Sequence, residues 1–328
     1  MRIYVDMASP AKKLEFAGYL HEFRQLAHHD RWGNHILSDS PEQADCILFI
    51  DAHVSASNPF YHIVDDHPYT HKYPEKVMVY DESDRPPSFG RGIYVSLPKR
   101  LFNPNRHSVV CYWLNVFDKW ELHQFDRARS EYCFFAGQVS QIPVRARIVK
   151  HLTDSVVRIK DTSAVSPWKT GSNAPTHSEL QQSRRDYTEL MMKHQYCLSP
   201  RGNGTSSIRL FEAFLYGAVP IVMADEYVPP HILNWNDCVV NINQRRPREI
   251  ILRQHQLQNE FNVRQQLVNR IQCDYFALDS RWNFFGNEIE RVMNSGSIWR
   301  TRSHIDAAKT KLYWLEHRII KRIEGRFV

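Results

Sequence analysis

The sequence contains no long uninterrupted hydrophobic run, since no stretch approaches the roughly 18 uncharged apolar residues of a membrane-spanning helix. It also lacks a secretory leader pattern, because the first six residues, Met-Arg-Ile-Tyr-Val-Asp, already carry charge. Cysteine is scarce: six cysteines are spread over 328 residues, and none forms a C-x-x-C pair or a zinc-finger spacing. We therefore expect a soluble, cytoplasmic protein with reduced thiols.

Excess positive charge is confined to the C-terminus. The formal net charge is +6, and residues 299–328 hold eight Lys and Arg against three acidic residues, which leaves 34 basic and 33 acidic residues elsewhere. The rest of the chain therefore lacks the basic surface that binds a phosphate backbone, and we expect no nucleic-acid partner. The basic segment 296–328 has an amphipathic helical pattern. We expect it to pack back on the first domain, with peripheral contact to an anionic membrane as the alternative.

Strand and helix patterns alternate along the whole chain. Residues 44–50 and 76–80 are continuous apolar runs, typical of strands buried in a parallel sheet. From residue 131 a second alternating series begins, and a chain of this length exceeds one hydrophobic core. The sequence predicts an α/β protein of two Rossmann-like domains facing across a cleft. We expect their boundaries at 1–130 and 131–295, followed by the helix at 296–328.

The block between residues 195 and 222 carries the clearest chemistry. A buried strand at 195–199 leads into a loop with two glycines, and a helix over about 206–216 follows, capped by Thr205 or Ser206. The N-terminus of such a helix binds anions, and two nearby arginines suit a diphosphate. The predicted diphosphate site consists of Arg201, Gly202, Asn203, Gly204, Thr205, Ser206, Ser207 and Arg209.

Glu212 follows Arg209 by one helical turn, so the two side chains share a helix face. A carboxylate in that position can accept both hydroxyls of a ribose while the arginine holds the phosphates. The structural alternative is a surface ion pair between Arg209 and Glu212 beside an ordinary glycine turn.

These residues resemble a known family. The runs Cys-Leu-Ser-Pro-Arg-Gly at 197–202, Ser-x-Arg-Leu-Phe-Glu-Ala at 207–213 and Gly-Ala-Val-Pro-Ile-Val at 217–222 closely resemble the signature region of exostosin-family glycosyltransferases. The resemblance covers about 187–240 and extends to Phe-Phe-Ala-Gly at 134–137 and to Arg145.

The resemblance implies a GT-B architecture and an inverting transfer of sugar from a nucleotide diphosphate, usually UDP, to an oligosaccharide or other hydroxyl acceptor. It implies no cofactor and no obligatory metal. It places Arg201, Arg209 and Glu212 on the diphosphate and ribose, with Gly137 and Arg145 also in the donor site.

An inverting displacement needs a general base for the acceptor hydroxyl. The candidates are carboxylates at strand ends of the first domain, Asp81 and Glu82 ahead of Asp51, with His53 or Asp65 next. Each of them can equally be an ordinary residue of a turn that ends a strand.

Several alternatives remain open at this point. The ligand-type residues of the segment 62–71 could hold a metal, but they lack a metal-binding spacing, and we expect none. A fucosyltransferase-like enzyme that uses a GDP-sugar, a catalytically silent nucleotide-sugar or glycan-binding protein, and a sugar-nucleotide epimerase or hydrolase would each keep the same donor site.

Overall fold

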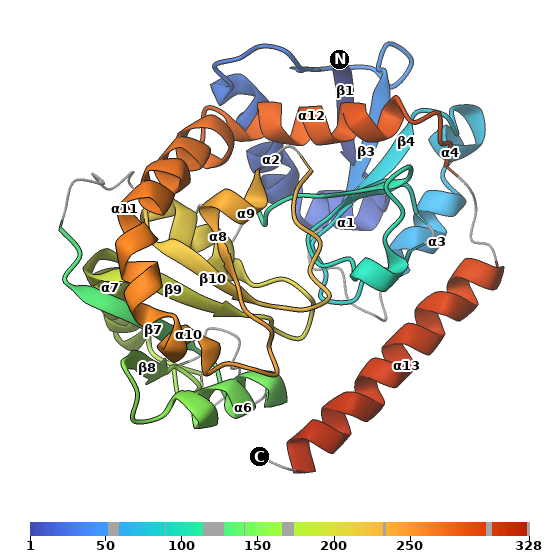
Figure 1. The fold of residues 1–328 in the computed structure, drawn as a ribbon. Coiled ribbons are helices and arrows are strands. Elements are labelled where there is room, and N and C mark those ends of the chain that lie inside the picture. Colours follow the sequence, from blue (N-terminus) through green and yellow to red (C-terminus); the bar gives the residue numbers. More distant parts are fainter. Residues whose placement is uncertain are drawn as a thin grey trace. The chain divides into compact units, whose positions relative to one another are not determined.

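The computed structural model describes residues 1–51, 59–88, 90–113, 128–140, 142–165, 174–231, 234–299 and 304–326. The chain divides into two compact units, and each contains one parallel sheet flanked by helices (Figure 1). The first unit is Met1–Asp118, Glu226–Leu233 and Cys273–Glu316, and the second is Lys119–Asp225, Asn234–Gln272 and His317–Val328. The two parallel sheets confirm the expected α/β fold with two Rossmann-like domains.

The first unit has a six-stranded parallel sheet with the strand order β2-β1-β3-β4-β5-β6. Its strands are β1 Arg2–Met7, β2 Ile36–Leu37, β3 Cys46–Ile50, β4 Val77–Asp81, β5 Gly92–Tyr94 and β6 His107–Val109. Its helices are α1 Pro10–Glu15, α2 Ala17–His29, α3 Phe60–Asp65, α4 Pro68–Lys72, a 3₁₀ turn Lys99–Leu101, α12 Arg281–Met293 and the first part of α13 His304–Arg326. The predicted apolar runs at 44–50 and 76–80 are the neighbouring strands β3 and β4.

The second unit has a five-stranded parallel sheet with the order β11-β10-β9-β7-β8. Its strands are β7 Glu131–Gly137, β8 Val157–Asp161, β9 His194–Pro200, β10 Val219–Met223 and β11 Val240–Asn241. Its helices are α6 Pro143–Leu152, α7 His177–Lys193, α8 Ile208–Leu215, α9 Trp235–Cys238, α10 Glu249–Leu252, α11 Gln254–Ile271 and the part of α13 that begins at His317. After α11, the π-helical turn Gln272–Phe276 leads from this unit into the first. The central strand β9 leads directly into the candidate site.

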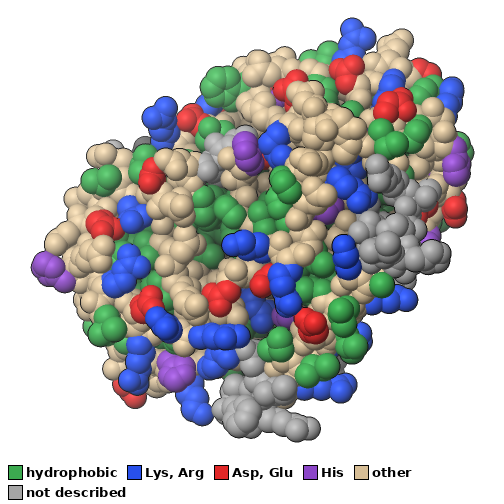
Figure 2. Space-filling model, turned by 45° about the vertical axis from the view of Figure 1, so that its right-hand side comes forward, with side chains coloured by type: hydrophobic (Ala, Val, Ile, Leu, Met, Phe, Trp, Pro, Cys, Tyr) green, Lys and Arg blue, Asp and Glu red, His purple; other side chains and the backbone are tan. Residues whose placement is uncertain are grey.

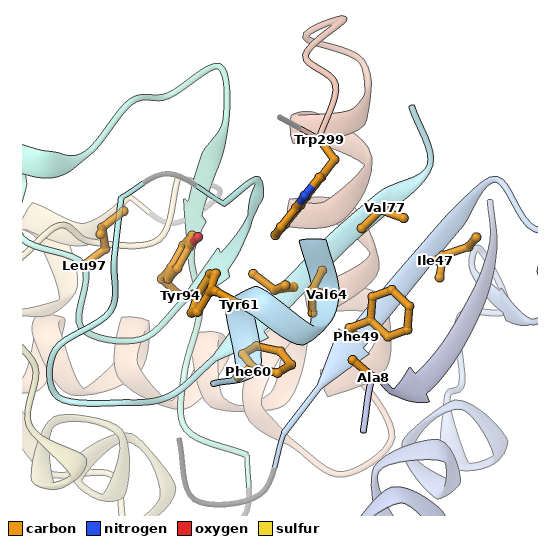
Figure 3. Close-up of a cluster of buried hydrophobic side chains, with 11 residues drawn as sticks. Ala8, Ile47, Phe49, Phe60, Tyr61, Val64, Val77, Tyr94, Leu97 and Trp299 are labelled. Atoms are coloured by element: carbon orange, nitrogen blue, oxygen red, sulfur yellow. The ribbon is translucent and has the colours of Figure 1, made fainter. Parts of the chain in front are cut away.

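Residues from the last part of the sequence complete the hydrophobic core of the first unit. Figure 3 shows Trp299 beside Tyr61 and Val64 of α3 in a cluster of buried apolar side chains. The Trp299 indole N–H donates to the Asp65 carboxylate at 3.0 Å. Trp282 of α12 is fully buried in the same unit.

The predicted boundary of the second domain at residue 295 therefore differs from the structure. Helix α12 belongs to the first unit, because its aromatic side chains pack on α2: the Phe285 ring stacks at 6.0 Å on Phe23, and Trp282 donates to the His35 carbonyl at 2.8 Å. The C-terminal helix begins at His304, and Thr310 lies 2.9 Å from Ser88 of the first unit, hydroxyl to hydroxyl.

On the face shown in Figure 2, Lys and Arg side chains are interspersed with acidic and hydrophobic ones. None of the helices in the described parts of the chain is both long enough and apolar enough to cross a membrane.

Candidate functional site

The loop of residues 201–207, which we call the anion loop, joins β9 to α8 in the second unit. Its shape is fixed at both ends: the Arg201 amide donates to Met223 of β10 at 3.2 Å, and the Gly202 amide donates to the Ser206 carbonyl at 3.2 Å. Because that turn holds Ser206 outside the helix, α8 begins at Ile208 with Ser207 as its N-cap. The expected capping by Thr205 or Ser206 is therefore wrong, and the Ser207 side chain caps nothing.

The anion loop buries two hydroxyl groups without a partner. Ser206 and Ser207 are 3% and 4% exposed, and neither hydroxyl oxygen has a hydrogen-bond partner within the described residues. A buried polar group without a partner costs free energy, and native proteins rarely leave one unless a ligand, an ion or water satisfies it. Since both hydroxyls lie at the positive end of the eight-residue helix α8, they suit an anion.

Arg209 lies in the first turn of α8 and is held over a neighbouring strand. Its Nε–H donates to the Ala136 carbonyl, and its guanidinium carbon lies 5.4 Å from the Phe135 ring centroid. No described carboxylate forms an ion pair with it, which leaves the terminal nitrogens of the guanidinium for an anionic ligand. Arg209 and Glu212 therefore do not form the surface ion pair that was the structural alternative.

Gly137 at the end of β7 leaves space for that guanidinium. A Cβ atom built on Gly137 would lie 2.1 Å from an Arg209 terminal nitrogen. The two residues that the sequence assigned separately to the donor site are thus in direct contact.

Glu212 is only 8% exposed and is fixed by a residue outside the predicted site. The Tyr187 hydroxyl of α7 donates to Glu212 Oε2 at 2.5 Å, and no described residue donates to Oε1. Burial raises the pKa of Glu212, whereas the Tyr187 hydrogen bond and the Arg209 charge act in the opposite direction. One carboxylate oxygen is therefore held by the protein and the other can accept hydrogen bonds from a ligand.

Arg145 of α6 holds the backbone where β9 enters the anion loop. Its guanidinium donates to the carbonyls of Arg201 at 3.1 Å, Gln138 at 3.3 Å and Pro200 at 3.4 Å. The side chain is 5% exposed, so it shapes the backbone at the end of β9. These contacts give Arg145 a positioning role, and its expected contact with the donor stays a prediction.

Arg201 is 9% exposed and is bonded on two sides. Its Nε–H donates to Gln244 Oε1 at 3.3 Å, and its Nη1 lies 3.4 Å from Nε2 of His317 in α13. A small pocket is lined by Ile142, Pro143, Val144, Arg201, Gly202, Asn203 and His317. Of the remaining predicted residues, Gly204 and Thr205 are buried within the anion loop.

In the first unit the predicted base Asp81 is fully buried. Its Oδ2 accepts from the Tyr61 hydroxyl at 2.6 Å and its Oδ1 from the Ser83 amide at 2.7 Å. Burial raises its pKa, and these two hydrogen bonds oppose the shift. Asp81 therefore holds the turn after β4 and is not accessible to a substrate, which agrees with the turn interpretation of this residue.

Glu82 is partly exposed and lies next in the chain. Burial is the main cause that raises its pKa to about 7, although Tyr80 donates to its Oε2 at 3.1 Å and opposes the shift. A carboxylate with a pKa near neutrality is suited to accept a proton.

Asp51 follows β3 and forms an ion pair with Lys12 of α1, with Nζ 2.7 Å from Oδ1. Its register places it beside Asp81, because Ile50 pairs with Tyr80 across β3 and β4. Of the reserve candidates, Asp65 accepts the indole N–H of Trp299, and His53 lies outside the described residues.

The segment 62–71 has structural roles in the described chain. His67 caps α4 by accepting the Tyr69 amide at 3.1 Å, and Asp65 binds Trp299. In the described parts of the chain, no three His, Cys, Asp or Glu side chains are grouped as metal ligands would be.

Sequence reasoning missed three residues of the donor-side cluster: Tyr187, Gln244 and His317. His317 is 116 residues from Arg201 in the chain, so no local spacing could have joined them. Tyr187 lies at the start of the segment of resemblance, but its type and position carry no signal that it binds Glu212.

One family model matches this chain. A model described as the exostosin GT47 domain matches residues 93–257, a segment that contains the anion loop, Arg209 and Glu212. A "Probable glycosyltransferase" of Arabidopsis thaliana is 36% identical over 67 residues, which are 20% of this chain and 14% of that protein. Exostosin-1c of Danio rerio is 24% identical over 141 residues, 42% of this chain and 18% of that protein.

The chain therefore matches less than a third of the length of these curated relatives. Among solved structures, a DNA-modifying β-glucosyltransferase, described with and without uridine diphosphoglucose, matches 88% of this chain and 100% of its own, at 11% identity and a TM-score of 0.39.

Proposed function

Because the chain belongs to the exostosin GT47 family, we propose that it is a glycosyltransferase that moves a sugar from a nucleotide diphosphate to the hydroxyl of a glycan or similar acceptor. The observation that supports this most directly is the pair of unpartnered buried hydroxyls on Ser206 and Ser207, one turn from the unpaired guanidinium of Arg209. Together with the α8 N-terminus they offer hydrogen-bond donors and positive charge for a diphosphate.

In the proposed reaction the acceptor oxygen bonds to the anomeric carbon as the bond from that carbon to the diphosphate oxygen breaks. Attack from the opposite side inverts the configuration. Negative charge grows on the departing diphosphate, and Arg209 with the α8 N-terminus stabilises it in the transition state. The free oxygen of Glu212 accepts the ribose hydroxyls.

The acceptor proton is assigned to Glu82. Asp81 is fully buried, and Asp51 forms an ion pair with Lys12. Glu82 also accepts hydrogen bonds, from Tyr80 at 3.1 Å and Tyr19 at 3.5 Å, but its side chain is partly exposed and burial raises its pKa to about 7. The Glu82 carboxylate takes the hydroxyl proton as the new bond forms.

The donor nucleotide is proposed to be UDP, as the family resemblance implies, with GDP as the alternative. Calorimetric titration with UDP and with GDP separates the two. Arg209→Ala and Glu212→Ala should each weaken binding of the preferred nucleotide by about 1.5–3 kcal/mol, the range for hydrogen bonds to charged groups.

A matched control is Arg246→Ala, which removes an exposed arginine whose nearest carboxylate, Glu249, is 4.0 Å away. This variant should bind the nucleotide as the wild type does. Unchanged affinity in folded Arg209→Ala and Glu212→Ala proteins would contradict the donor site.

Because guanidinium groups and a helix end supply the positive charge, we propose that transfer needs no metal and persists in EDTA. Activity that is lost in EDTA and restored by Mn²⁺ or Mg²⁺ would contradict this. Nucleotide binding without transfer to any acceptor of a glycan panel would indicate a silent binding protein, and products formed without an acceptor would indicate a hydrolase or epimerase.

A further inference from the structure

The C-terminal helix α13 uses one side to pack on the first unit. Tyr313 and Trp314 are 6% and 8% exposed. The Arg100 guanidinium lies 4.8 Å from the Tyr313 ring centroid and also pairs with Glu316 at 3.1 Å. These contacts fix which side of the helix faces away from the unit.

The side facing away is apolar. Leu312, Leu315 and Ile319 are 58%, 48% and 50% exposed, and their spacing of three and four residues places them in one stripe along the helix. Ile320 beside the stripe is 43% exposed. Soluble proteins expose single large apolar residues commonly, but a continuous stripe of them marks an interaction surface.

Cations border this stripe. Lys311, Arg318 and Arg322 lie along one edge by helical spacing, Lys309 lies along the other, and all four are exposed. None of them forms an ion pair with a described carboxylate, and the nearby Glu316 is neutralised by Arg100. Long basic side chains can extend sideways from an apolar surface and keep their charge in a polar layer.

We propose that the outer face of α13 binds the surface of an anionic lipid bilayer, with Leu312, Leu315 and Ile319 in the interface and the four flanking cations on lipid headgroups. This combination of an apolar stripe and a basic border is what an interfacial helix requires. A second copy of the chain fits poorly, because pairing two such stripes would bring identical cations together. A nucleic acid offers phosphates to the border but nothing to the apolar centre.

The test is sedimentation of the 328-residue chain with vesicles at physiological ionic strength. Vesicles of phosphatidylcholine mixed with phosphatidylserine should bind it at least about tenfold more tightly than vesicles of phosphatidylcholine alone. The variant Leu312→Gln/Leu315→Gln/Ile319→Gln should lose about tenfold or more of the binding, and Lys311→Gln/Arg318→Gln about fivefold for each cation removed.

A control variant, Leu252→Gln/Val263→Gln, changes apolar residues that are 83% and 65% exposed outside α13, and it should bind vesicles as the wild type does. Circular dichroism and the thermal midpoint establish that each variant is folded. Absent binding to anionic vesicles, equal binding to both vesicle types, or equal binding by the wild type and the triple variant would overturn the proposal. A dimer in light scattering that the triple variant converts to a monomer, without vesicle binding, would assign the face to a second copy instead.

Discussion

Gly137 and Arg209 share one space: the arginine guanidinium occupies the position where any side chain at residue 137 would begin, 2.1 Å from a built Cβ. Any larger residue at 137 must displace the guanidinium, because the backbone of β7 is fixed between β8 and β9. The end of strand β7 thereby controls the position of a cation on helix α8.

Gly137→Ala should therefore weaken UDP binding by about 1.5–3 kcal/mol without removing any polar group, because the methyl group displaces Arg209 from its position. Calorimetry measures this directly. Gly18→Ala is the matched control, since no atom lies within 4 Å of the added Cβ there. Equal affinities of Gly137→Ala and wild type would show that the observed position of Arg209 is not needed for binding.

Ser206→Ala and Ser207→Ala should reduce UDP affinity about 2- to 12-fold each while leaving thermal stability unchanged or raised. The hydroxyls are buried without partners, so removing them relieves an unsatisfied group in the free protein but takes a bond from the ligand. Titration and thermal melting together measure the two effects.

Ser280→Ala is the contrasting variant, because its buried hydroxyl already donates to the Cys273 carbonyl at 2.5 Å. It should lower the thermal midpoint and leave UDP affinity unchanged. If Ser206→Ala and Ser207→Ala also lower the thermal midpoint and leave UDP affinity unchanged, their hydroxyls have a structural role and do not bind ligand.

Tyr187→Phe should weaken UDP binding more at the acidic end of a pH series than at its alkaline end. Burial already raises the pKa of Glu212, and loss of the Tyr187 hydrogen bond raises it further, so a larger fraction is protonated at the lower pH. Tyr132→Phe, whose buried hydroxyl donates to the Ile250 carbonyl at 2.8 Å in the same unit, is the control. A loss of affinity that does not vary with pH would mean that Tyr187 acts through packing alone.

Transfer activity should rise with pH through about 7, since Glu82 must lose its proton before it can act as a base and its pKa is raised to about 7. Glu82→Gln should abolish this rise and lower kcat by about 10²–10⁴-fold while UDP affinity stays intact. A pH profile of kcat/KM for wild type and variant checks both points. Asp51→Asn is measured in parallel, and a larger loss there with near-normal Glu82→Gln would move the role to Asp51.

The local structure of the candidate site was largely predictable because its parts are consecutive, while its role in donor binding stays a prediction. The apolar strand, the glycine loop and the helix lie within residues 194–215, and backbone hydrogen bonding alone brings them together. The error in the start of α8 has a local cause as well: the turn between Gly202 and Ser206 outweighs the capping preference of Thr205.

Two of the acidic candidates show what a sequence cannot distinguish. Asp51 follows the buried strand β3 and Asp81 ends the buried strand β4, yet Asp51 pairs with Lys12 and Asp81 accepts from Tyr61, and those partners come from separate helices. Their different environments depend on tertiary packing and not on strand-end position. The same holds for α12. Its apolar spacing in the sequence does not show which unit it belongs to, and the contact of Phe285 with Phe23 places it in the first unit.

The position of Trp299 in the first core also governs when that core can form in the cell. Strands β1 to β6 leave the ribosome early, but Trp282 and Trp299 are added only after the whole of β7 to α11 has been made. At typical rates of about 5–20 residues per second, the delay after β6 is roughly ten to forty seconds. During translation the second sheet therefore has all its strands before the last aromatic residues of the first core exist, and the first unit can reach its final packing only after residue 299 has been made.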